Sequence, residues 1–428
     1  MKIVAVIFMS IVALMLFLII KYPKIQVFKK EVQTFWIAPL LGTIFVLLFH
    51  FIDLDKVISG LTTNSSINPI KIIILFFSMT FMSIVLDELG FFEYLAHKAL
   101  NKAKANQKVL FFILYALTSI LTIFTSNDII ILTFTPFIIF FTKNAKINPL
   151  PYLVSEFAAA NTWSMMFIIG NPTNIYLATS NNLNFLEYFR VMFLPSVMSG
   201  LVLLLVLYLL FKNELSKPLQ VKDEETPIKN KFLLVSNLIC LGLCTLILVI
   251  SSYIGLDMYL IALIFATILL AILIGYSIVN KNASYLTSGI KRIPWSLAPF
   301  VISMFTLVLM LEEYSITEEL VKLLGDKNYI LKYGVSSTLT CNIVNNLPMS
   351  VLFAKIIPNG NLQAIYSTII GSNIGAFLSP IGALAGIMWL SILKKYNVNY
   401  NFMKFMKYGV MVVIPTLFTA LLGLAIIL

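Results

Sequence analysis

The stretch FTSNDIIILTFTPF, residues 124 to 137, places a carboxylate inside an apolar run. Asp128 follows an apolar segment that begins near Val109 and precedes one that ends near Thr142. An ionised carboxylate at the centre of a bilayer costs about 2.5–3.5 kcal/mol on insertion scales, so a membrane chain keeps one only where it faces protein or a watery cavity. The stretch therefore predicts a polar site at membrane depth.

The composition is that of an all-α polytopic membrane protein. Hydrophobic residues make up 60% of the 428 residues and charged residues 11%, whereas a soluble domain is about a quarter charged. Apolar runs long enough to span a bilayer recur along the whole chain, which predicts about ten spans. The expected spans are 3–20, 35–52, 70–90, 152–178, 188–211, 233–252, 257–279, 295–314, 364–393 and 408–428.

Two further apolar stretches, 109–142 and 331–357, have polar residues at their middle. We expect each half to be too short to cross roughly 30 Å of hydrocarbon at about 1.5 Å per residue. Irregular backbone at membrane depth is tolerated where it is buried in protein or lines a cavity. We therefore interpret both stretches as re-entrant hairpins, which enter and leave on the same side.

The Lys and Arg residues predict the orientation, because cytoplasmic loops carry an excess of them. Of the 30 basic residues, 22 fall in loops that the expected spans place on one side. These loops are 21–34, 91–108, 143–151, 212–232, 280–294 and 394–407. That side is interpreted as cytoplasmic, which places both termini outside and predicts an integral protein of a bacterial or archaeal cytoplasmic membrane.

The two halves of the chain resemble each other. SMTFMSIVLDELG (78–90) aligns with SMFTLVLMLEEYS (303–315), YALTSILTIFTSND (115–128) with YGVSSTLTCNIVNN (333–346), and AANTWSMMFIIGNPTN (159–174) with GSNIGAFLSPIGALAG (371–386). Since the two units start on opposite sides, the repeat is predicted to be inverted, which is typical of secondary transporters. The predicted parts are an extra span (1–34), the first repeat (35–211), a cytoplasmic linker with another extra span (212–256) and the second repeat (257–428).

Four polar clusters mark the interrupted helices, where Gly and Pro free backbone groups and Asn offers both a donor and an acceptor. The predicted substrate- and ion-binding residues are Ser126, Asn127, Asp128, Asn161, Gly170, Asn171, Pro172, Thr173, Asn174, Asn342, Asn345, Asn346, Asn373, Ser379 and Gly382. Asp128 is the one acid in these clusters and is the first candidate to carry a proton or to help hold Na⁺. Glu156, Asp87 and Glu88 are further candidates; the last two lie near a span end, where ion pairing is an equal alternative.

These residues resemble the ion transporter superfamily, and most closely its ArsB/NhaD group of arsenite and antimonite permeases. SNDIIILTFTP (126–136), NNLPMSVLFA (345–354) and SPIGALAGIMWLSIL (379–393) are similar to that group's segments, and LDELGFFEYLA (86–96) is similar to its first-half signature. The resemblance implies opposed hairpins and export of the neutral arsenite trihydroxide in exchange for protons, in some members with a separate ATPase subunit. It also implies Asp at the positions of Asn161 and Asn373, and a Lys near Leu378.

The sequence thus predicts a secondary active transporter driven by an ion gradient. Efflux of arsenite or antimonite coupled to protons is the preferred hypothesis. A Na⁺-coupled carrier of carboxylates or inorganic anions, or a Na⁺/H⁺ antiporter, remains an alternative, as does a channel. An enzyme would need a nucleophile with its base, or a metal cluster, at depth. The expected partners are a small inorganic or carboxylate solute, H⁺ or Na⁺, and the lipid bilayer; a homodimer is left open, and no nucleic acid, metal or other cofactor is expected.

Overall fold

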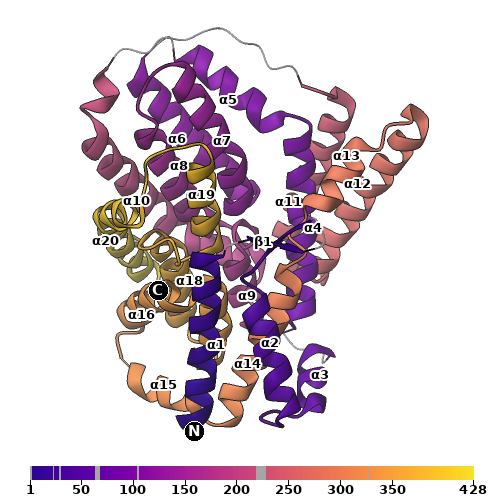
Figure 1. The fold of residues 1–428 in the computed structure, drawn as a ribbon, viewed down its shortest axis with the longest axis vertical. Helices are drawn as coiled ribbons and strands as arrows, with labels where there is room; N and C mark the ends of the chain where they lie inside the picture. Colours follow the sequence, from indigo (N-terminus) through magenta and orange to yellow (C-terminus); the bar gives the residue numbers. More distant parts are fainter. Residues whose placement is uncertain are drawn as a thin grey trace.

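Helices form nearly all of the protein in a computed structural model, which describes residues 2–22, 24–27, 30–62, 68–103, 106–217, 228–325 and 327–428 (Figure 1). The central part of the predicted cytoplasmic linker, 218–227, lies outside the described residues. The longer helices are α1 (Lys2–Lys21), α4 (Pro69–Glu88), α6 (Gln107–Phe124), α7 (Asn127–Asn144), α10 (Phe185–Phe211), α11 (Lys231–Ile254), α12 (Met258–Asn280), α14 (Leu297–Glu313), α16 (Tyr329–Val344) and α20 (Phe402–Ile427). The shorter helices are α2 (Ile37–Leu48), α3 (Leu54–Thr62), α5 (Phe91–Lys102), α8 (Leu150–Trp163), α9 (Pro172–Ser180), α13 (Ser284–Arg292), α15 (Ile316–Leu324), α17 (Asn346–Ile356), α18 (Leu362–Ile374) and α19 (Leu384–Lys395). Single 3-10 turns are η1 (Ser164–Met166), η2 (Ile168–Gly170), η3 (Glu214–Ser216) and η4 (Gly375–Phe377).

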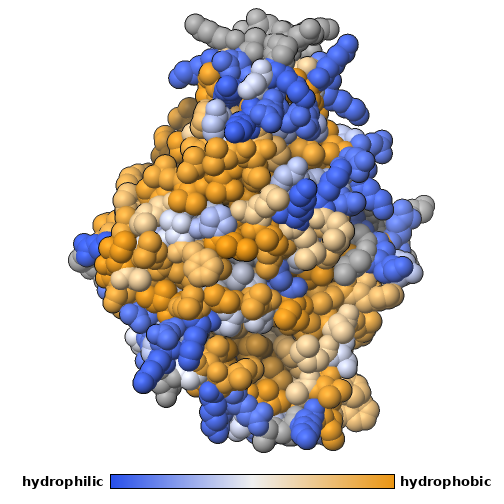
Figure 2. Space-filling view, turned by 90° about the vertical axis from the view of Figure 1, so that its left-hand side faces the viewer, coloured by the Kyte–Doolittle hydropathy of each residue, from blue (hydrophilic) through white to orange (hydrophobic). Residues whose placement is uncertain are grey.

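Eight segments within the described ranges are long and apolar enough to cross a membrane. Leu201, Leu205 and Leu209 recur every four residues along α10 and are 60%, 57% and 53% exposed, so they form a stripe that suits lipid rather than water. Figure 2 shows apolar residues over the middle of one face, with hydrophilic residues gathered towards both ends. The prediction of a polytopic helical membrane protein is confirmed.

Three predicted spans differ from single long helices. The span at 35–52 contains α2, which has only 12 residues. The spans at 152–178 and 364–393 are each broken: α8 and α9 are separated by break 1 (residues 164–171), and α18 and α19 by break 2 (residues 375–383). Both interruptions fall at the Gly- and Pro-containing clusters, as predicted, because those residues do not maintain a helical ladder.

A small β-hairpin lies where the sequence analysis expects only a loop. Strands β1 (Lys24–Val27) and β2 (Lys30–Gln33) pair antiparallel. The Thr34 hydroxyl closes the base by donating to the carbonyl of Tyr22 at 2.7 Å, and Phe35 packs edge-on against Phe300 of α14. Each strand has four residues, too short for a two-residue hydrophobic period to stand out from the sequence.

Hairpin 1 (α6 and α7) and hairpin 2 (α16 and α17) occupy the two stretches predicted to be re-entrant. The expectation that every half is too short to cross the membrane is wrong for hairpin 1. Its helices have 18 residues each, or roughly 27 Å. The α17 half of hairpin 2 has 11 residues and remains short. Polar tips, rather than arm length, distinguish hairpin 1 from an ordinary pair of spans.

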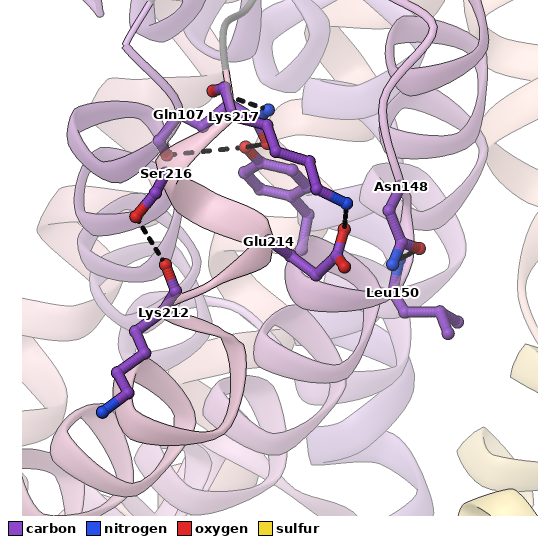
Figure 3. Close-up of polar contacts among 8 residues, drawn as sticks. Gln107, Asn148, Leu150, Lys212, Glu214, Ser216 and Lys217 are labelled. Atoms are coloured by element: carbon purple, nitrogen blue, oxygen red, sulfur yellow. Dashed lines mark hydrogen bonds and ion pairs between the residues drawn. The ribbon is translucent and has the colours of Figure 1, made fainter.

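The base of hairpin 1 is bonded to the start of the linker (Figure 3). Gln107, which begins α6, donates from its side-chain amide to the carbonyl of Lys217 at 3.0 Å and accepts from the Tyr152 hydroxyl of α8 at 3.0 Å. The ammonium of Lys217 hydrogen-bonds Glu214 at 2.7 Å and lowers the pKa of that carboxyl, and Asn148 acts in the same direction. Three of the loops predicted to be cytoplasmic therefore meet at one end of the molecule.

Hairpin 2 has its base at the opposite end. Tyr333 near the start of α16 donates to the carbonyl of Ile356 at the end of α17, at 3.1 Å. Lys355 pairs with Glu312 at the end of α14, 2.8 Å away. The start of α14 lies near Arg292, which pairs with the end of α4. The 17 residues of α14 therefore separate this ion pair from the one at Glu312 by roughly 25 Å. In Figure 1, α5 and α13 lie at one end, and α3, α15 and the N-terminus at the other.

The two hairpins pack in corresponding ways. In hairpin 1, α6 packs on α8 of the same half, and α7 packs on α19 of the other half. In hairpin 2, α16 packs on α18, and α17 packs on α9. Each hairpin thus touches one broken helix from each half, an arrangement that agrees with the proposed inverted repeat.

Cysteine labelling tests the predicted orientation. The native Cys240, Cys244 and Cys341 are buried, so background labelling should be low. On intact cells, a membrane-impermeant maleimide should label Leu323→Cys on α15, where the leucine is 82% exposed. The variant Lys281→Cys, at the end of α12, should react only after permeabilisation. The reverse pattern would place the linker outside and overturn the orientation.

Candidate functional site

The two hairpin tips differ in how the chain turns. In hairpin 1, Thr125 and Ser126 join the arms, with Ser126 in extended conformation before α7. In hairpin 2, Asn345 alone joins the arms with a φ of 77°, and its side chain accepts from the backbone N–H of Leu347. Asparagine tolerates positive φ better than most residues, which accounts for its place in this tight turn.

Break 1 is held by a close approach of its own backbone. A Cβ on Gly170 would lie 2.2 Å from the carbonyl oxygen of Ser164, so only glycine fits. Asn171 follows in extended conformation and caps α9, accepting from the N–H of Thr173 at 3.1 Å. Pro172 takes the first helical position, where its missing N–H has no cost.

Asn373 of α18 connects the two broken helices. Its amide oxygen accepts from the Ser164 hydroxyl and from the Asn171 amide, both at 2.9 Å, and its amide nitrogen donates to Asn174 at 2.6 Å. All of these groups are buried, as is the pair of hydroxyls formed by Thr173 and Ser372. This part of the predicted site is already satisfied by its own hydrogen bonds and holds the two halves together.

Each tip is bonded to the broken helix of its own half. Asn127 donates to the side-chain oxygen of Asn161 at 3.2 Å. Asn345 donates to the carbonyl of Ile381 at 2.9 Å, and the backbone N–H of Asn346 donates to the carbonyl of Gly382 at 3.0 Å. The structure therefore brings the tip of hairpin 1 against α8 and the tip of hairpin 2 against break 2.

Four buried oxygen atoms at these tips and at break 2 have no hydrogen-bond partner among the described residues. They are the amide oxygens of Asn127 and Asn342 and the hydroxyls of Ser126 and Ser379. Leaving a buried polar group unsatisfied costs about 1–3 kcal/mol, so such atoms cluster where a ligand or water completes them. These four oxygens are therefore available to hydrogen-bond water or a ligand.

A cavity of about 600 Å³ reaches the tip of hairpin 1. Ser126 and Asp128 line it together with Thr80 of α4, and Lys24, Lys291 and Arg292 line it from β1 and α13. Asp128 is half-buried and, within the part of the chain that the structure describes, has neither a hydrogen-bond nor an ion-pair partner. An unbalanced carboxylate beside a cavity is suited to take up a cation or a proton.

Glu156 is buried away from the tips. Its carboxylate accepts from Thr135 of α7 at 3.0 and 3.1 Å and from the Trp389 indole of α19 at 3.3 Å. Glu156 thereby joins α8 to α7 of hairpin 1 and to α19, which follows break 2. All of these contacts are with protein side chains. They favour a structural role for Glu156 over direct contact with solute.

The acid pairs at the span ends form ion pairs. Asp87 and Glu88 both bind Arg292 at 2.5 Å, at the border of the cavity. Their counterparts in the second half, Glu312 and Glu313, pair with Lys355 and Lys56. Among the described residues no group of three or more His, Cys, Asp or Glu side chains is placed to hold a metal ion.

Comparisons with known proteins agree with the fold. A family model described as citrate transporter, CitMHS, matches residues 3–369. The chain is 24% identical over 371 residues to an arsenical pump membrane protein of Escherichia coli, and 25% identical over 371 residues to one of Yersinia enterocolitica; each match covers 82% of this chain and 85% of the relative. The structure of the Alcanivorax borkumensis YdaH transporter matches 100% of this chain and 96% of its own with a TM-score of 0.57 at 12% identity.

The family match covers most of the chain, and the fold has a transporter as its structural neighbour. The two hairpins with bases at opposite ends agree with the resemblance to the ion transporter superfamily. This protein therefore belongs to the CitMHS family of secondary transporters, within the ion transporter superfamily.

Proposed function

We propose that this protein exports arsenite or antimonite as a neutral trihydroxide, in exchange for protons. The relatives named arsenical pump membrane proteins support this choice of solute. The proposal places the protein in a bacterial or archaeal cytoplasmic membrane with both termini outside. The proposal requires neither a separate ATPase subunit nor a homodimer.

The observation that carries the proposal is the set of unpartnered buried oxygens at the tips. Within the described part of the chain no donor reaches the amide oxygens of Asn127 and Asn342, and a trihydroxide supplies three O–H donors. A carboxylate solute would instead need cationic side chains or open helix N-termini. The polar segments 124–128, 161–174, 342–346 and 373–383 contain no Lys or Arg. The cationic side chains on the cavity beside hairpin 1 come from β1 and α13, and Arg292 among them is already paired with two acids of α4.

The helix N-termini near the site are largely closed to an anion. Asn171 caps α9, and Asn345 caps α17, where the N–H of Asn346 already donates to Gly382. The first turn of α7 contains Asp128, whose charge repels an anion. These features favour a neutral solute that donates hydrogen bonds.

Transport by everted membrane vesicles tests the solute. Respiration acidifies the vesicle lumen, so proton exchange should accumulate labelled arsenite inside, and a protonophore should abolish the accumulation. Antimonite should compete, and citrate should not. Vesicles from cells that lack this protein serve as the control.

A Na⁺-coupled carboxylate carrier is the second candidate, and the citrate transporter description of the matching family favours it. Citrate accumulation driven by an inward Na⁺ gradient, with no response to arsenite, would support this candidate and refute arsenite export. Counterflow of preloaded solute would separate either carrier from a channel, because a channel does not couple the two fluxes.

A further inference from the structure

Helix α11 carries an amide and two thiols on the side that packs on α4. Asn237, Cys240 and Cys244 follow one another at spacings of three and four residues, so they lie on one face of the helix. The Asn237 amide donates to the carbonyl of Met82 at 2.8 Å, and the Cys244 sulfur lies 3.9 Å from the Met79 sulfur. Cys240 comes between these two contacts and therefore also faces α4.

All three side chains on this face are buried. Asn237 and Cys244 are 0% exposed, Cys240 is 5% exposed, and both cysteines are free thiols. The amide oxygen of Asn237 accepts no hydrogen bond from any described residue, which is costly for a buried acceptor. The face thus combines a pair of thiols with an acceptor that lacks a donor.

The two thiols are spaced to bind one atom between them. Residues four apart on a helix have Cβ atoms about 5–6 Å apart, and rotation about χ1 can turn both sulfurs towards a common point. A disulfide needs its Cβ atoms roughly 3.5–4.5 Å apart, so direct oxidation of this pair would strain the helix. An atom bonded to both sulfurs fits this spacing better than a sulfur–sulfur bond does.

We propose that Cys240 and Cys244 form a binding site for trivalent arsenic or antimony, apart from the polar residues of the hairpin tips and breaks. Arsenic trihydroxide condenses with the two thiols. Two As–S bonds replace two As–O bonds, each departing hydroxide takes a thiol proton and leaves as water, and no electron is transferred. The remaining hydroxyl on arsenic donates to the amide oxygen of Asn237. This inference rests on the proposed function only for the presence of arsenite as a solute.

The apolar surroundings favour a neutral metalloid over a metal cation. Two neutral thiols and a neutral trihydroxide give a neutral product, so no charge is buried in the span. A structural Zn²⁺ site commonly has four Cys or His ligands, and the described residues contain no group of three or more His, Cys, Asp or Glu placed to hold a metal. Met79 is the neighbour that must move as arsenic enters, and its flexible thioether can adapt.

X-ray absorption at the arsenic edge tests the site in purified full-length protein. The protein is incubated with sodium arsenite in detergent and then separated from the excess. We expect about one retained arsenic atom per chain, with sulfur and oxygen neighbours in a ratio of about two to one. Cys240→Ser and Cys244→Ser each leave a single thiol and should weaken retention about a hundredfold, because the second bond is no longer intramolecular.

Cys341→Ser on α16 is the matched control. Cys341 is also buried, but its thiol donates to the carbonyl of Thr338 at 3.1 Å, and α16 contains no second cysteine. This variant should retain arsenic as the wild type does. Asn237→Ala should weaken retention about threefold to tenfold, since the hydrogen bond from the remaining hydroxyl is lost.

A measurement on the wild type alone tests the site without any variant. Prolonged alkylation by N-ethylmaleimide, followed by peptide mapping, should show that arsenite protects Cys240 and Cys244 but not Cys341. Melting temperatures without arsenite show which of the variants are folded and can be compared.

Arsenic with only oxygen neighbours in the wild type would overturn the proposal, as would As–S bonding that persists unchanged in Cys240→Ser and Cys244→Ser. No ion gradient is present in these measurements. A failure of arsenite export would therefore leave the thiol result unchanged, and an absence of As–S bonding would not refute export.

Discussion

Replacing Asp128 by asparagine is expected to abolish uphill transport while leaving the protein folded and able to exchange solute. The variant keeps the size of the side chain and removes its ionisation. Accumulation driven by a pH gradient should fall to the level of vesicles without the protein, because no ionisable group at this position would then couple proton movement to that of the solute. Exchange of labelled for unlabelled arsenite should persist, since it needs no net proton movement.

The folded state should tolerate this change. Asp128 has no partner among the described residues, so asparagine removes an uncompensated charge rather than breaking a pair. Glu313→Gln is a suitable control, because Glu313 forms an exposed ion pair with Lys56 that should contribute at most about 1 kcal/mol. Full gradient-driven transport by Asp128→Asn with an unchanged pH profile would show that the carboxylate is structural, and Glu156 would be the next acid to test.

Replacing Gly170 by alanine is expected to destabilise the protein and stop transport. The added Cβ would lie 2.2 Å from the carbonyl oxygen of Ser164 and 2.9 Å from its carbonyl carbon, so the backbone must shift. That same carbonyl accepts from Asn174 at 2.8 Å, and the Ser164 hydroxyl donates to Asn373. Overpacking of this kind costs about 1–3 kcal/mol, and here it also displaces the contact between the two broken helices.

Gly242→Ala is the matched control. A Cβ at Gly242 on α11 would meet nothing within 4 Å, so alanine should leave the melting temperature unchanged or slightly raised and transport intact. Melting temperatures of the purified variants and arsenite exchange in proteoliposomes provide the comparison. A Gly170→Ala variant with wild-type stability and exchange would show that break 1 does not need its present geometry.

The sequence predicts the interruptions of the fold well, for a physical reason. Gly170, Pro172 and Asn345 belong to polar clusters within apolar runs, and helices end or begin at these clusters. Isolated prolines such as Pro136 and Pro195 instead lie inside continuous helices. The acid pairs at 87–88 and 312–313 align between the halves, and the alternative that they form ion pairs is confirmed. The inverted repeat and its boundaries stay predictions, supported by hairpin bases at opposite ends.

The parts that sequence reasoning missed depend on contacts between distant segments. Trp389 is one of many aromatic residues in the expected spans, and only its indole hydrogen bond to Glu156 of the other half sets it apart. Ser164 gains its importance through Asn373, more than 200 residues away. The strands at 24–33 are too short to show a period, and their place against α14 follows from tertiary packing.

Asn161 and Asn373 show why one residue type in aligned positions does not imply one role. Asn161 accepts from the tip of hairpin 1, whereas Asn373 accepts from Ser164 and Asn171 of break 1. An aspartate at either position, which the resemblance implies, would keep the acceptors but lose the donor contacts to Phe157 and Asn174. This chain has amides at both positions, and Asp128 is the one acid in the predicted polar clusters.

Proton movement driven by arsenite tests the central claim most directly. Purified protein is reconstituted into liposomes that contain a trapped pH-sensitive dye, with the membrane potential clamped, and arsenite is added outside. Exchange predicts that arsenite enters as protons leave, so the lumen becomes alkaline with the wild type but not with Asp128→Asn or in protein-free liposomes. Arsenite entry through the wild-type protein with no change in lumenal pH would contradict proton-coupled transport of arsenite.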